Sequence, residues 1–282
     1  VRLVGKGPHA RAMAEGGLRL TGIWGVSDLP DVKACESVGE ALDGGFRPQW
    51  TLLSVKSYDT AAAMKDLAPA LPGLHGVVSL QNGLGNLDAI EAAAPGMAVG
   101  GRVIFGATTL APGAVEVTVS ADDVLIGPGH ESVHDVVAAF RSSGIPCRFE
   151  ERILSYIWDK VLYNVCLNAP ATILKTDYGK LWDDPDSRAV IERLVREFYL
   201  VAGARGVTPV SPGPSEYLAR FESELLPPTR GHRSSMQEDI ENGRPTEIEA
   251  LNGAVARMAR EHGMEAPLNE SLAGMVRFLE RH

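Results

Sequence analysis

The sequence contains few cysteines and no long hydrophobic run. Its three cysteines lie far apart and form neither a C-x-x-C pair nor a metal-ligand spacing. They are interpreted as reduced thiols of a cytoplasmic protein. No apolar stretch is long enough to cross a bilayer, and the first residues do not resemble a signal peptide. A cytoplasmic protein without a membrane-spanning segment is therefore expected.

Positive charge is also scarce. The 282 residues include 27 Lys and Arg against 36 Asp and Glu, which gives a net charge of −9. No basic run and no alternation of basic and aromatic residues appears, so binding to nucleic acid or to an anionic membrane is not expected. The hydrophobic share of 45% is ordinary for a globular protein. A chain of this length is expected to form two domains rather than one.

The first half of the chain shows short apolar runs that alternate with helical patterns. We predict strands at residues 1–4, 18–22, 24–28, 51–56, 76–80, 103–109, 115–119, 124–127 and 147–149. Helices are predicted at 9–15, at 58–71, from about 86, and at 132–142. This alternation is typical of an α/β Rossmann-type domain. After residue 150 the pattern becomes helical throughout, so we predict a domain at 1–150 and an all-helical domain at 151–282.

The longest predicted helix, Glu151–Lys175, carries an unusual polar stripe. Lys160, Asn164 and Asn168 are spaced four residues apart, which keeps them on one face with a drift of about 40° per step. Their neighbours are apolar: Ile157, Trp158, Val161, Leu162, Val165 and Leu167. A helix that is apolar nearly all round is buried, so its polar stripe must face partners or a cavity. One ammonium and two amides there would suit a small oxygen-rich molecule.

The alternative is a surface helix whose polar residues face water. It is less compatible with the sequence, because Trp158 and Leu162 would then have no obvious place to pack.

Two further groups of polar residues stand out. Lys56 and Asn82 follow predicted strands, and ligands of open α/β sheets bind beyond the carboxyl ends of strands. Asn82-Gly83 is equally typical of a tight turn. Ser235 and Glu247 lie in the polar stretch from His232 to Gly253.

The residues of this stretch also have simple structural interpretations. Ser235 would serve as a loop hydroxyl or helix cap. Thr246 would cap a helix together with Glu249 in a capping box, with Glu247 in the first turn.

The N-terminal segment allows two interpretations. Gly5-Lys6-Gly7-Pro8-His9-Ala10 matches the dinucleotide pattern G-x-G-x-x-A, but Pro8 removes a backbone donor and the following helix is short. Alternatively, residues 1–4 form the second strand of a Rossmann sheet. Lys6 would then lie near the adenosine ribose, where a cation favours NADP. We favour the second interpretation.

Taken together, six stretches carry a family resemblance: VRLVGKG, SVKSYDT, LQNGLGN, WDKVLYNVCLN, SSMQEDIENGRPTEIEALNG and HGMEAPLN. The chain resembles the ketopantoate reductase (2-dehydropantoate 2-reductase) family from near its first residue to its end. The K-x-x-x-N-x-x-x-N helix, combined with S-S-M-Q-x-D and T-E-I-E-x-L-N-G, is the most specific part of the match. The resemblance implies a Rossmann domain, a helical domain and an active site in the cleft between them.

The resemblance also implies roles for individual residues. Lys160 corresponds to the general acid, and Glu247 to the carboxylate that orients the reaction. Asn164, Asn168 and Ser235 correspond to groups that hold the carboxylate and hydroxyl of the substrate. The implied reaction is the reduction of ketopantoate to pantoate in pantothenate biosynthesis.

NADPH is the cofactor that the resemblance implies. Asn82 corresponds to the residue beside nicotinamide and substrate, Lys56 to a cofactor-contacting lysine, and Lys6 to the basic residue for the 2′-phosphate. The family pattern starts with a strand and a G-x-G-x-x-G loop about 25 residues before the position of Lys6. We expect this segment to precede Val1, the alternative being a truncated protein in which cofactor binding is lost.

The chemistry of Lys160 agrees with the implied role. Reduction of a ketone places negative charge on its oxygen, which a nearby ammonium can stabilise and protonate. Apolar neighbours would lower the pKa of Lys160, whereas a nearby Glu247 would raise it. The two asparagines can both donate and accept, which suits binding better than proton transfer.

Three alternatives remain at this stage. The protein could reduce another 2-oxo acid, act as a non-catalytic binding protein, or belong to a different two-domain dehydrogenase family. The expected ligand of a reductase is a small-molecule 2-oxo acid, whereas the non-catalytic alternative would bind a small acid or a partner. The apolar faces of the helical domain would suit a homodimer.

Overall fold

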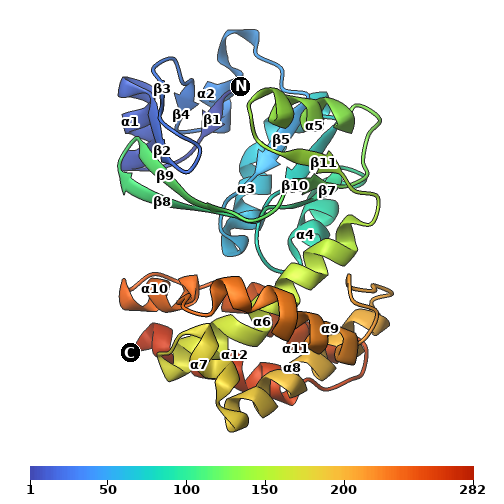
Figure 1. Cartoon of the computed structure of the whole chain (residues 1–282). Helices are drawn as coiled ribbons and strands as arrows, with labels where there is room; N and C mark the ends of the chain where they lie inside the picture. The colour runs from blue at the N-terminus through green and yellow to red at the C-terminus, as the bar shows by residue number, and fades with distance from the viewer. The chain divides into compact units, whose positions relative to one another are not determined.

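The computed structural model describes all 282 residues and forms two compact units (Figure 1). Unit 1 comprises Val1–Val55, Asp59–Leu80 and Leu87–Glu151. Unit 2 comprises Arg152–His282 together with two short segments from the first half of the chain, Lys56–Tyr58 and Gln81–Asn86. These two segments contain Lys56 and Asn82, so both residues pack within the same unit as the helical residues.

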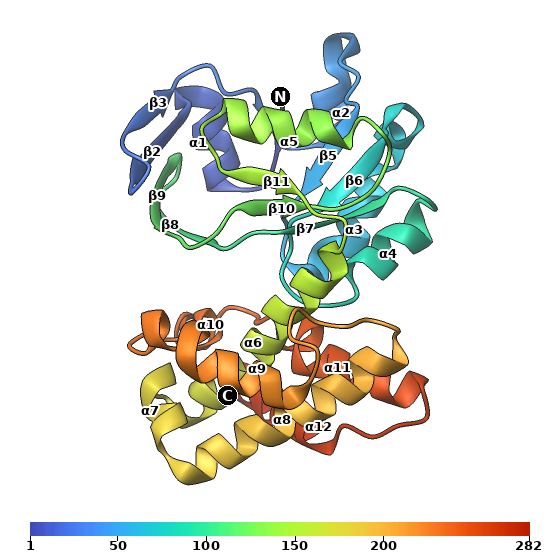
Figure 2. The ribbon, with the colours of Figure 1, turned by 45° about the vertical axis from the view of Figure 1, so that its right-hand side comes forward.

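The main sheet of unit 1 has five strands in the order β11-β10-β7-β6-β5. Neighbouring strands are parallel except for the antiparallel pair β7 and β10. Helix α5 covers one face, whereas α3 and α4 cover the other (Figures 1 and 2). The elements are β5 (Trp50–Leu53), β6 (Gly76–Ser79), β7 (Ala98–Arg102), β10 (Val124–Ile126), β11 (Cys147–Phe149), α3 (Thr60–Leu67), α4 (Asn86–Ala93) and α5 (Val133–Ser142).

Strand β6 shows why this sheet is buried on both faces. Val77 and Val78 are adjacent and fully buried, and successive side chains of a strand point to opposite faces. Val77 belongs to a cluster with Met64 of α3, whereas Val78 belongs to a cluster with Val136 of α5. A continuous apolar run is therefore required, as in the parallel sheets of Rossmann-type domains.

The rest of unit 1 consists of smaller elements. A four-stranded sheet has the order β3-β2-β9-β8, and a parallel pair joins β1 to β4. Their bounds are β1 (Leu3–Val4), β2 (Leu18–Gly22), β3 (Ser27–Leu29), β4 (Ala34–Cys35), β8 (Phe105–Ala111) and β9 (Ala114–Ser120). Helices α1 (Pro8–Gly16) and α2 (Val38–Leu42) lie between them in the chain, and 3₁₀ segments span Asp43–Gly45 and Ala68–Gly73. A further 3₁₀ segment, Ser57–Asp59, begins in unit 2 and ends in unit 1.

Several predicted elements of unit 1 differ from the structure. The predicted helix at 58–71 is too long, because α3 ends at Leu67 and a 3₁₀ segment that contains Pro69 and Pro72 follows it. Proline lacks the N–H that a continuing α-helix needs. The strand predicted at 24–28 begins later in the structure, as β3 (Ser27–Leu29). The chain turns just before it, where Gly25 has a φ of 84°.

Strand β7 was not predicted, because its sequence AVGGR contains two glycines, which weaken a strand pattern. A side chain at Gly101 would lie 2.9 Å from the Ser79 carbonyl oxygen, so this position needs a glycine.

Unit 2 is built from helices around α6. The helices are α6 (Ile153–Leu174), α7 (Tyr178–Asp183), α8 (Pro185–Ala204), α9 (Pro214–Arg220), α10 (Ser235–Glu241), α11 (Asn252–Glu261) and α12 (Pro267–Arg281). A π-helical turn spans Phe221–Leu225, and 3₁₀ segments span Pro227–Thr229 and Ile248–Ala250. None of the helices combines the length and hydropathy that a membrane crossing requires.

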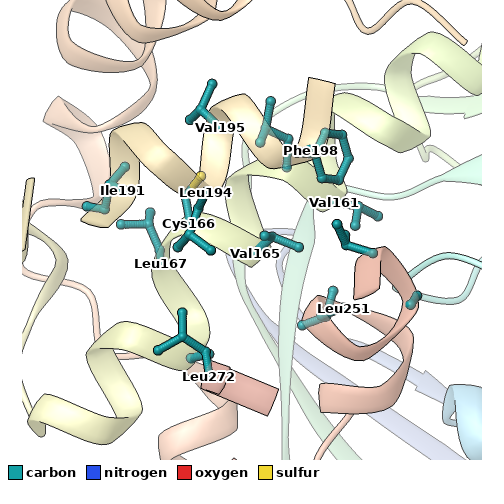
Figure 3. Close-up of a cluster of buried hydrophobic side chains, with 14 of the residues drawn as sticks. Val161, Val165, Cys166, Leu167, Ile191, Leu194, Val195, Phe198, Leu251 and Leu272 are labelled. Carbon is teal, nitrogen blue, oxygen red and sulfur yellow. The ribbon is translucent and has the colours of Figure 1, made fainter. Parts of the chain in front are cut away.

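The core of unit 2 lies between α6 and its neighbours. Figure 3 shows Val161, Val165, Cys166 and Leu167 of α6 together with apolar side chains of α8 and with Leu251 and Leu272. Trp158 is 5% exposed and Leu162 is fully buried. The alternative in which this helix lies on the surface is therefore wrong, and α6 is a central helix that carries a polar stripe.

Candidate active site

Lys160 of α6 is joined to the loop that follows β6. Its ammonium donates to Asn82 Oδ1 at 2.6 Å. The loop is fixed against the segment after Glu247, because the Leu84 N–H donates to the Ala250 carbonyl at 2.7 Å. Gly83 has a φ of +87°, and a Cβ atom there would lie 2.5 Å from the Ala250 Cβ. The chain thus bends at Asn82-Gly83, and the glycine allows the close approach to Ala250 directly after Asn82.

The Glu247 carboxylate lies near the nitrogen of the Asn82 side-chain amide. Its Oε2 lies 3.5 Å from Asn82 Nδ2 and 3.7 Å from Lys56 Nζ. Its Oε1 accepts the backbone N–H of Ser57 at 3.0 Å and lies 3.1 Å from Ser57 Oγ. Asn82 therefore bridges Lys160 and Glu247, with its oxygen toward the ammonium and its nitrogen toward the carboxylate.

Asp239 completes the charges around Lys56. It lies 3.3 Å from Lys56 Nζ and accepts from Arg244 Nε at 2.8 Å. The Asp239 side chain is only 9% exposed, compared with 44% for Lys56. Both carboxylates that face Lys56 are thus largely buried, whereas the lysine reaches solvent.

Ser57, Asn86 and Asp239 also belong to this set of contacts and were not predicted from the sequence. Ser57 Oγ lies 2.5 Å from the Asn82 carbonyl oxygen, and Asn86 Nδ2 donates to the same oxygen at 2.8 Å. The position of Ser57 directly after Lys56 was a usable signal. The four-residue spacing of Ser235 and Asp239 was another, because it places both on one face of α10.

The polar stripe of α6 continues away from Lys160. Asn164 is half-buried, and Asn168 is 6% exposed. Asn168 Oδ1 accepts from the Tyr178 hydroxyl at 2.8 Å. The stripe therefore changes along the helix from an ammonium near the charged groups to an amide in a buried environment.

Two of the structural alternatives for the His232–Gly253 stretch are wrong. Ser234 rather than Ser235 caps α10, because Ser234 Oγ accepts the Gln237 N–H at 3.0 Å, and Ser235 is left exposed in the first turn. Thr246 forms no capping box with Glu249, whose carboxylate pairs with Arg277 instead.

Thr246 is anchored to α12. Its N–H and its hydroxyl donate to Glu280 Oε1 at 2.8 and 2.7 Å, and α11 begins only at Asn252. The C-terminal helix therefore holds the backbone next to Glu247.

Lys6 belongs to unit 1, unlike the other candidate residues. It follows β1 and pairs with Asp66 at 3.2 Å, with 81% of its side chain exposed. The structure thus brings Lys56, Asn82, Lys160 and Glu247 into one network. The functional roles of these residues, and of Asn164, Asn168, Ser235 and Lys6, stay predictions.

Comparisons with known proteins extend this picture. The family model described as "Ketopantoate reductase PanE/ApbA" matches residues 1–131, and the one described as "Ketopantoate reductase PanE/ApbA C terminal" matches residues 152–280. The 2-dehydropantoate 2-reductase of Aquifex aeolicus is 35% identical over 93% of this chain and 85% of that protein. The 2-dehydropantoate 2-reductase of Halobacterium salinarum is 32% identical over 97% of this chain and 88% of that protein.

Solved structures show the same fold. A PanE/ApbA family ketopantoate reductase from Ralstonia eutropha has a TM-score of 0.85 and 26% identity, covering 98% of this chain and 89% of that one. A D-mandelate dehydrogenase solved with NADH and anilino(oxo)acetate also has a TM-score of 0.85, with 24% identity over 100% of this chain and 91% of that one. The predicted combination of a Rossmann-type α/β part and a helical part is confirmed. The chain therefore belongs to the ketopantoate reductase family of pyridine-nucleotide-dependent oxidoreductases.

Proposed function

We propose that the protein reduces 2-dehydropantoate (ketopantoate) to pantoate with NADPH, a step of pantothenate biosynthesis. The relatives that share about a third of its residues are named 2-dehydropantoate 2-reductases. The observation that carries the proposal is the set of contacts among Lys160, Asn82 and Glu247. The Lys160 ammonium donates to the Asn82 amide oxygen, and the amide nitrogen lies 3.5 Å from the Glu247 carboxylate. Residues 1–150 would act as the NADP-binding domain and residues 151–282 as the substrate-binding and catalytic domain.

Lys160 is the proposed proton donor. When bound, NADPH supplies the hydride that is added to the keto carbon. Lys160 stabilises the negative charge that develops on the keto oxygen and gives that oxygen its proton, so that the product is a hydroxy acid. The 2.6 Å bond to Asn82 holds the ammonium in one place before substrate arrives. Glu247 orients Asn82 and, through it, the ammonium.

Asn164, Asn168 and Ser235 are the proposed substrate-binding residues. The amides come from successive turns of α6, and the exposed hydroxyl comes from the first turn of α10. Amide and hydroxyl groups can hold the carboxylate and hydroxyl oxygens of a 2-oxo acid without transferring a proton. Asn82 would contact the substrate as well as the cofactor.

The residues of the chain fit a pyridine nucleotide. Lys6, Lys56 and Asn82 each lie beyond the carboxyl end of a strand, where α/β sheets bind such ligands. Lys56 and Asn82 would contact the cofactor near the reaction centre. Lys6 would pair with the 2′-phosphate, which NADH lacks, and would exchange Asp66 for that phosphate.

The first test is a fluorescence titration of the purified protein with NADPH and, alongside, with NADH. We expect tight binding that favours NADPH, and a Lys6→Ala variant that loses the preference while still binding NADH. Equal affinity for both cofactors would contradict the role of Lys6. Binding of neither would favour the non-catalytic alternative.

The second test compares substrates. Ketopantoate is expected to have the highest kcat/KM in a panel of 2-oxo acids that differ at the carbon next to the ketone. A higher kcat/KM for another 2-oxo acid of the panel would support the proposed type of reaction but contradict ketopantoate as the substrate. Sedimentation analysis of the same preparation would test whether the protein forms the expected homodimer. We also propose a cytoplasmic location, in keeping with the biosynthetic role.

A further inference from the structure

A buried set of hydroxyl groups lies behind the polar stripe of α6. Thr172 Oγ1 donates to the Asn168 carbonyl at 2.7 Å and lies 2.9 Å from Ser234 Oγ. The Tyr178 hydroxyl, from the first turn of α7, donates to the Asn168 side chain at 2.8 Å. Tyr178 is 3% exposed, Thr172 is 2% exposed and Ser234 is fully buried. These groups connect α6, α7 and the N-terminal end of α10 around Asn168.

The contact between Tyr178 and Asn168 has a defined direction. An amide oxygen can only accept a hydrogen bond, so the phenol must be the donor to Oδ1. Burial raises the pKa of Tyr178 far above its ordinary value, and the hydroxyl therefore keeps its proton at every working pH. A flipped Asn168 amide would present NH₂ to the phenol, and the buried phenol proton would lose the acceptor it has here.

The orientation of Asn168 follows from this contact. Its Oδ1 is engaged by Tyr178, and its Nδ2 donates to no protein group in the structure. The amide hydrogens are thus the part of the Asn168 side chain that is left for a ligand. We propose that Tyr178 is a positioning residue that makes Asn168 an obligate hydrogen-bond donor toward a substrate oxygen. This inference rests on the proposed function, in which Asn168 contacts the 2-oxo acid.

The test compares two tyrosine variants. Tyr178→Phe removes the donor to Asn168 and keeps the ring. Tyr163→Phe is a matched control, because the two rings lie 6.2 Å apart and the Tyr163 hydroxyl bonds to Thr229 at 2.5 Å instead of to a candidate substrate residue. Each variant loses one largely buried hydroxyl contact, so their effects on stability should be similar.

We expect Tyr178→Phe to raise the KM for ketopantoate about tenfold, with kcat changed less than about threefold, because a tenfold change corresponds to one lost oriented hydrogen bond. The KM for NADPH should not change. Tyr163→Phe should leave all three values within about twofold. Equal changes in both variants, or a parallel loss of kcat and of cofactor affinity in Tyr178→Phe, would overturn the positioning role.

A double-mutant cycle shows whether Tyr178 acts through Asn168. In an Asn168→Ala background, Tyr178→Phe should change the KM for ketopantoate by less than about twofold, because the group it positions is gone. If the two single effects multiply in the double variant, Tyr178 acts by another route and the proposal is wrong.

A readout without substrate separates this proposal from the proposed function. Protein labelled with ¹⁵N-asparagine gives side-chain NH₂ signals, and the one lost in Asn168→Ala identifies Asn168. This signal should shift in Tyr178→Phe and stay in place in Tyr163→Phe. Should the wild-type protein reduce no 2-oxo acid, the proposed function fails, yet a shifted signal would still show that Tyr178 orients Asn168. An unshifted signal would overturn the positioning role whatever the activity.

Discussion

Unit 2 contains two polar networks that differ in charge and in burial. The network of Lys160, Asn82 and Glu247 contains charges of both signs, and its members are exposed or half-buried. The other network is internal. Asn252 and Asn269 are both fully buried and are joined by a 3.0 Å hydrogen bond.

The internal network satisfies the backbone of the protein itself. Glu197 of α8 accepts the Leu268 and Asn269 N–H groups at 2.9 and 3.0 Å, at the start of α12. Asn252 Nδ2 also lies 3.3 Å from the Val165 carbonyl of α6. Each contact replaces a bond to water that burial removes, which is what a structural network must do. In the site network, by contrast, the Lys160 ammonium donates to the Asn82 side chain, whose amide nitrogen lies 3.5 Å from Glu247, so these contacts join side chains to one another. We therefore predict that changes in the site network alter activity and that changes in the internal network alter stability.

The largest expected effect is on Lys160. Lys160→Ala should lower kcat about 10²–10⁴-fold, because the general acid is lost, and should leave NADPH affinity unchanged. Lys160→Arg should be nearly as inactive, because a guanidinium does not release its proton. Steady-state kinetics beside a Lys180→Ala control, a lysine that is 79% exposed on α7, would measure this. If the Lys160→Ala variant kept most of the wild-type kcat, the proposed role of Lys160 as proton donor would be wrong.

The internal network should give the opposite result. Asn269→Ala removes the partner of Asn252 and one donor to Glu197, and leaves buried polar groups unpaired. The free energy of unfolding should fall by about 1–3 kcal/mol, while kcat and KM stay close to wild type. Urea unfolding followed by circular dichroism is the measurement. Ser271→Ala, an exposed hydroxyl on the same helix, is the control and should change nothing. A loss of activity in folded Asn269→Ala would show that the networks are coupled.

Ser57 should give a smaller effect on activity. Its single hydroxyl proton is shared between Glu247 Oε1 at 3.1 Å and the Asn82 carbonyl at 2.5 Å, while its backbone N–H holds Glu247 independently. Ser57→Ala should therefore lower kcat about three- to tenfold, the cost of one of several bonds that orient the site. The unfolding midpoint should not move, and Ser54→Ala, an exposed serine three residues earlier, should behave as wild type. An unchanged kcat in Ser57→Ala would mean that the backbone alone positions Glu247.

The site network and the internal network also differ in how far the sequence reveals them. The stripe of Lys160, Asn164 and Asn168 could be predicted, because a four-residue period in an apolar helix is a local pattern. Asn82 and Glu247 were singled out for their surroundings in the sequence, and the family resemblance supplied their roles. Their bridge to Lys160 joins residues far apart in the chain, and no local pattern shows it.

The missed features are mostly tertiary. Tyr178 contacts Asn168 across two helices, and Thr246 is held by Glu280 of α12 in place of the capping box that its sequence favours. Strand β7 was missed for a local reason, since its glycines lower strand propensity, while the close approach of neighbouring backbone makes Gly101 necessary. For Thr246 and for Gly101, tertiary packing overrode the local sequence preference.

The smallest expected effect concerns pH and a thiol outside both networks. Burial of Cys147 in β11 raises the pKa of its thiol from 9.0 to about 11. The unfolded chain would release this proton at lower pH than the folded protein does. The stabilising contribution is therefore complete below about pH 9 and is lost as the pH rises toward 11.

This effect can be isolated with urea midpoints at about pH 8 and about pH 10.5. Wild type should lose more stability between these two pH values than Cys147→Ala does. The thiol of the fully buried Cys166 also has a raised pKa, so Cys166→Ala is a second test of the same pH dependence. If Cys147→Ala lost as much stability as wild type, the alkaline sensitivity would come from other groups. A change in the pH dependence of kcat in Cys147→Ala would instead connect this core thiol to the site, and the separation of activity from internal packing would no longer hold.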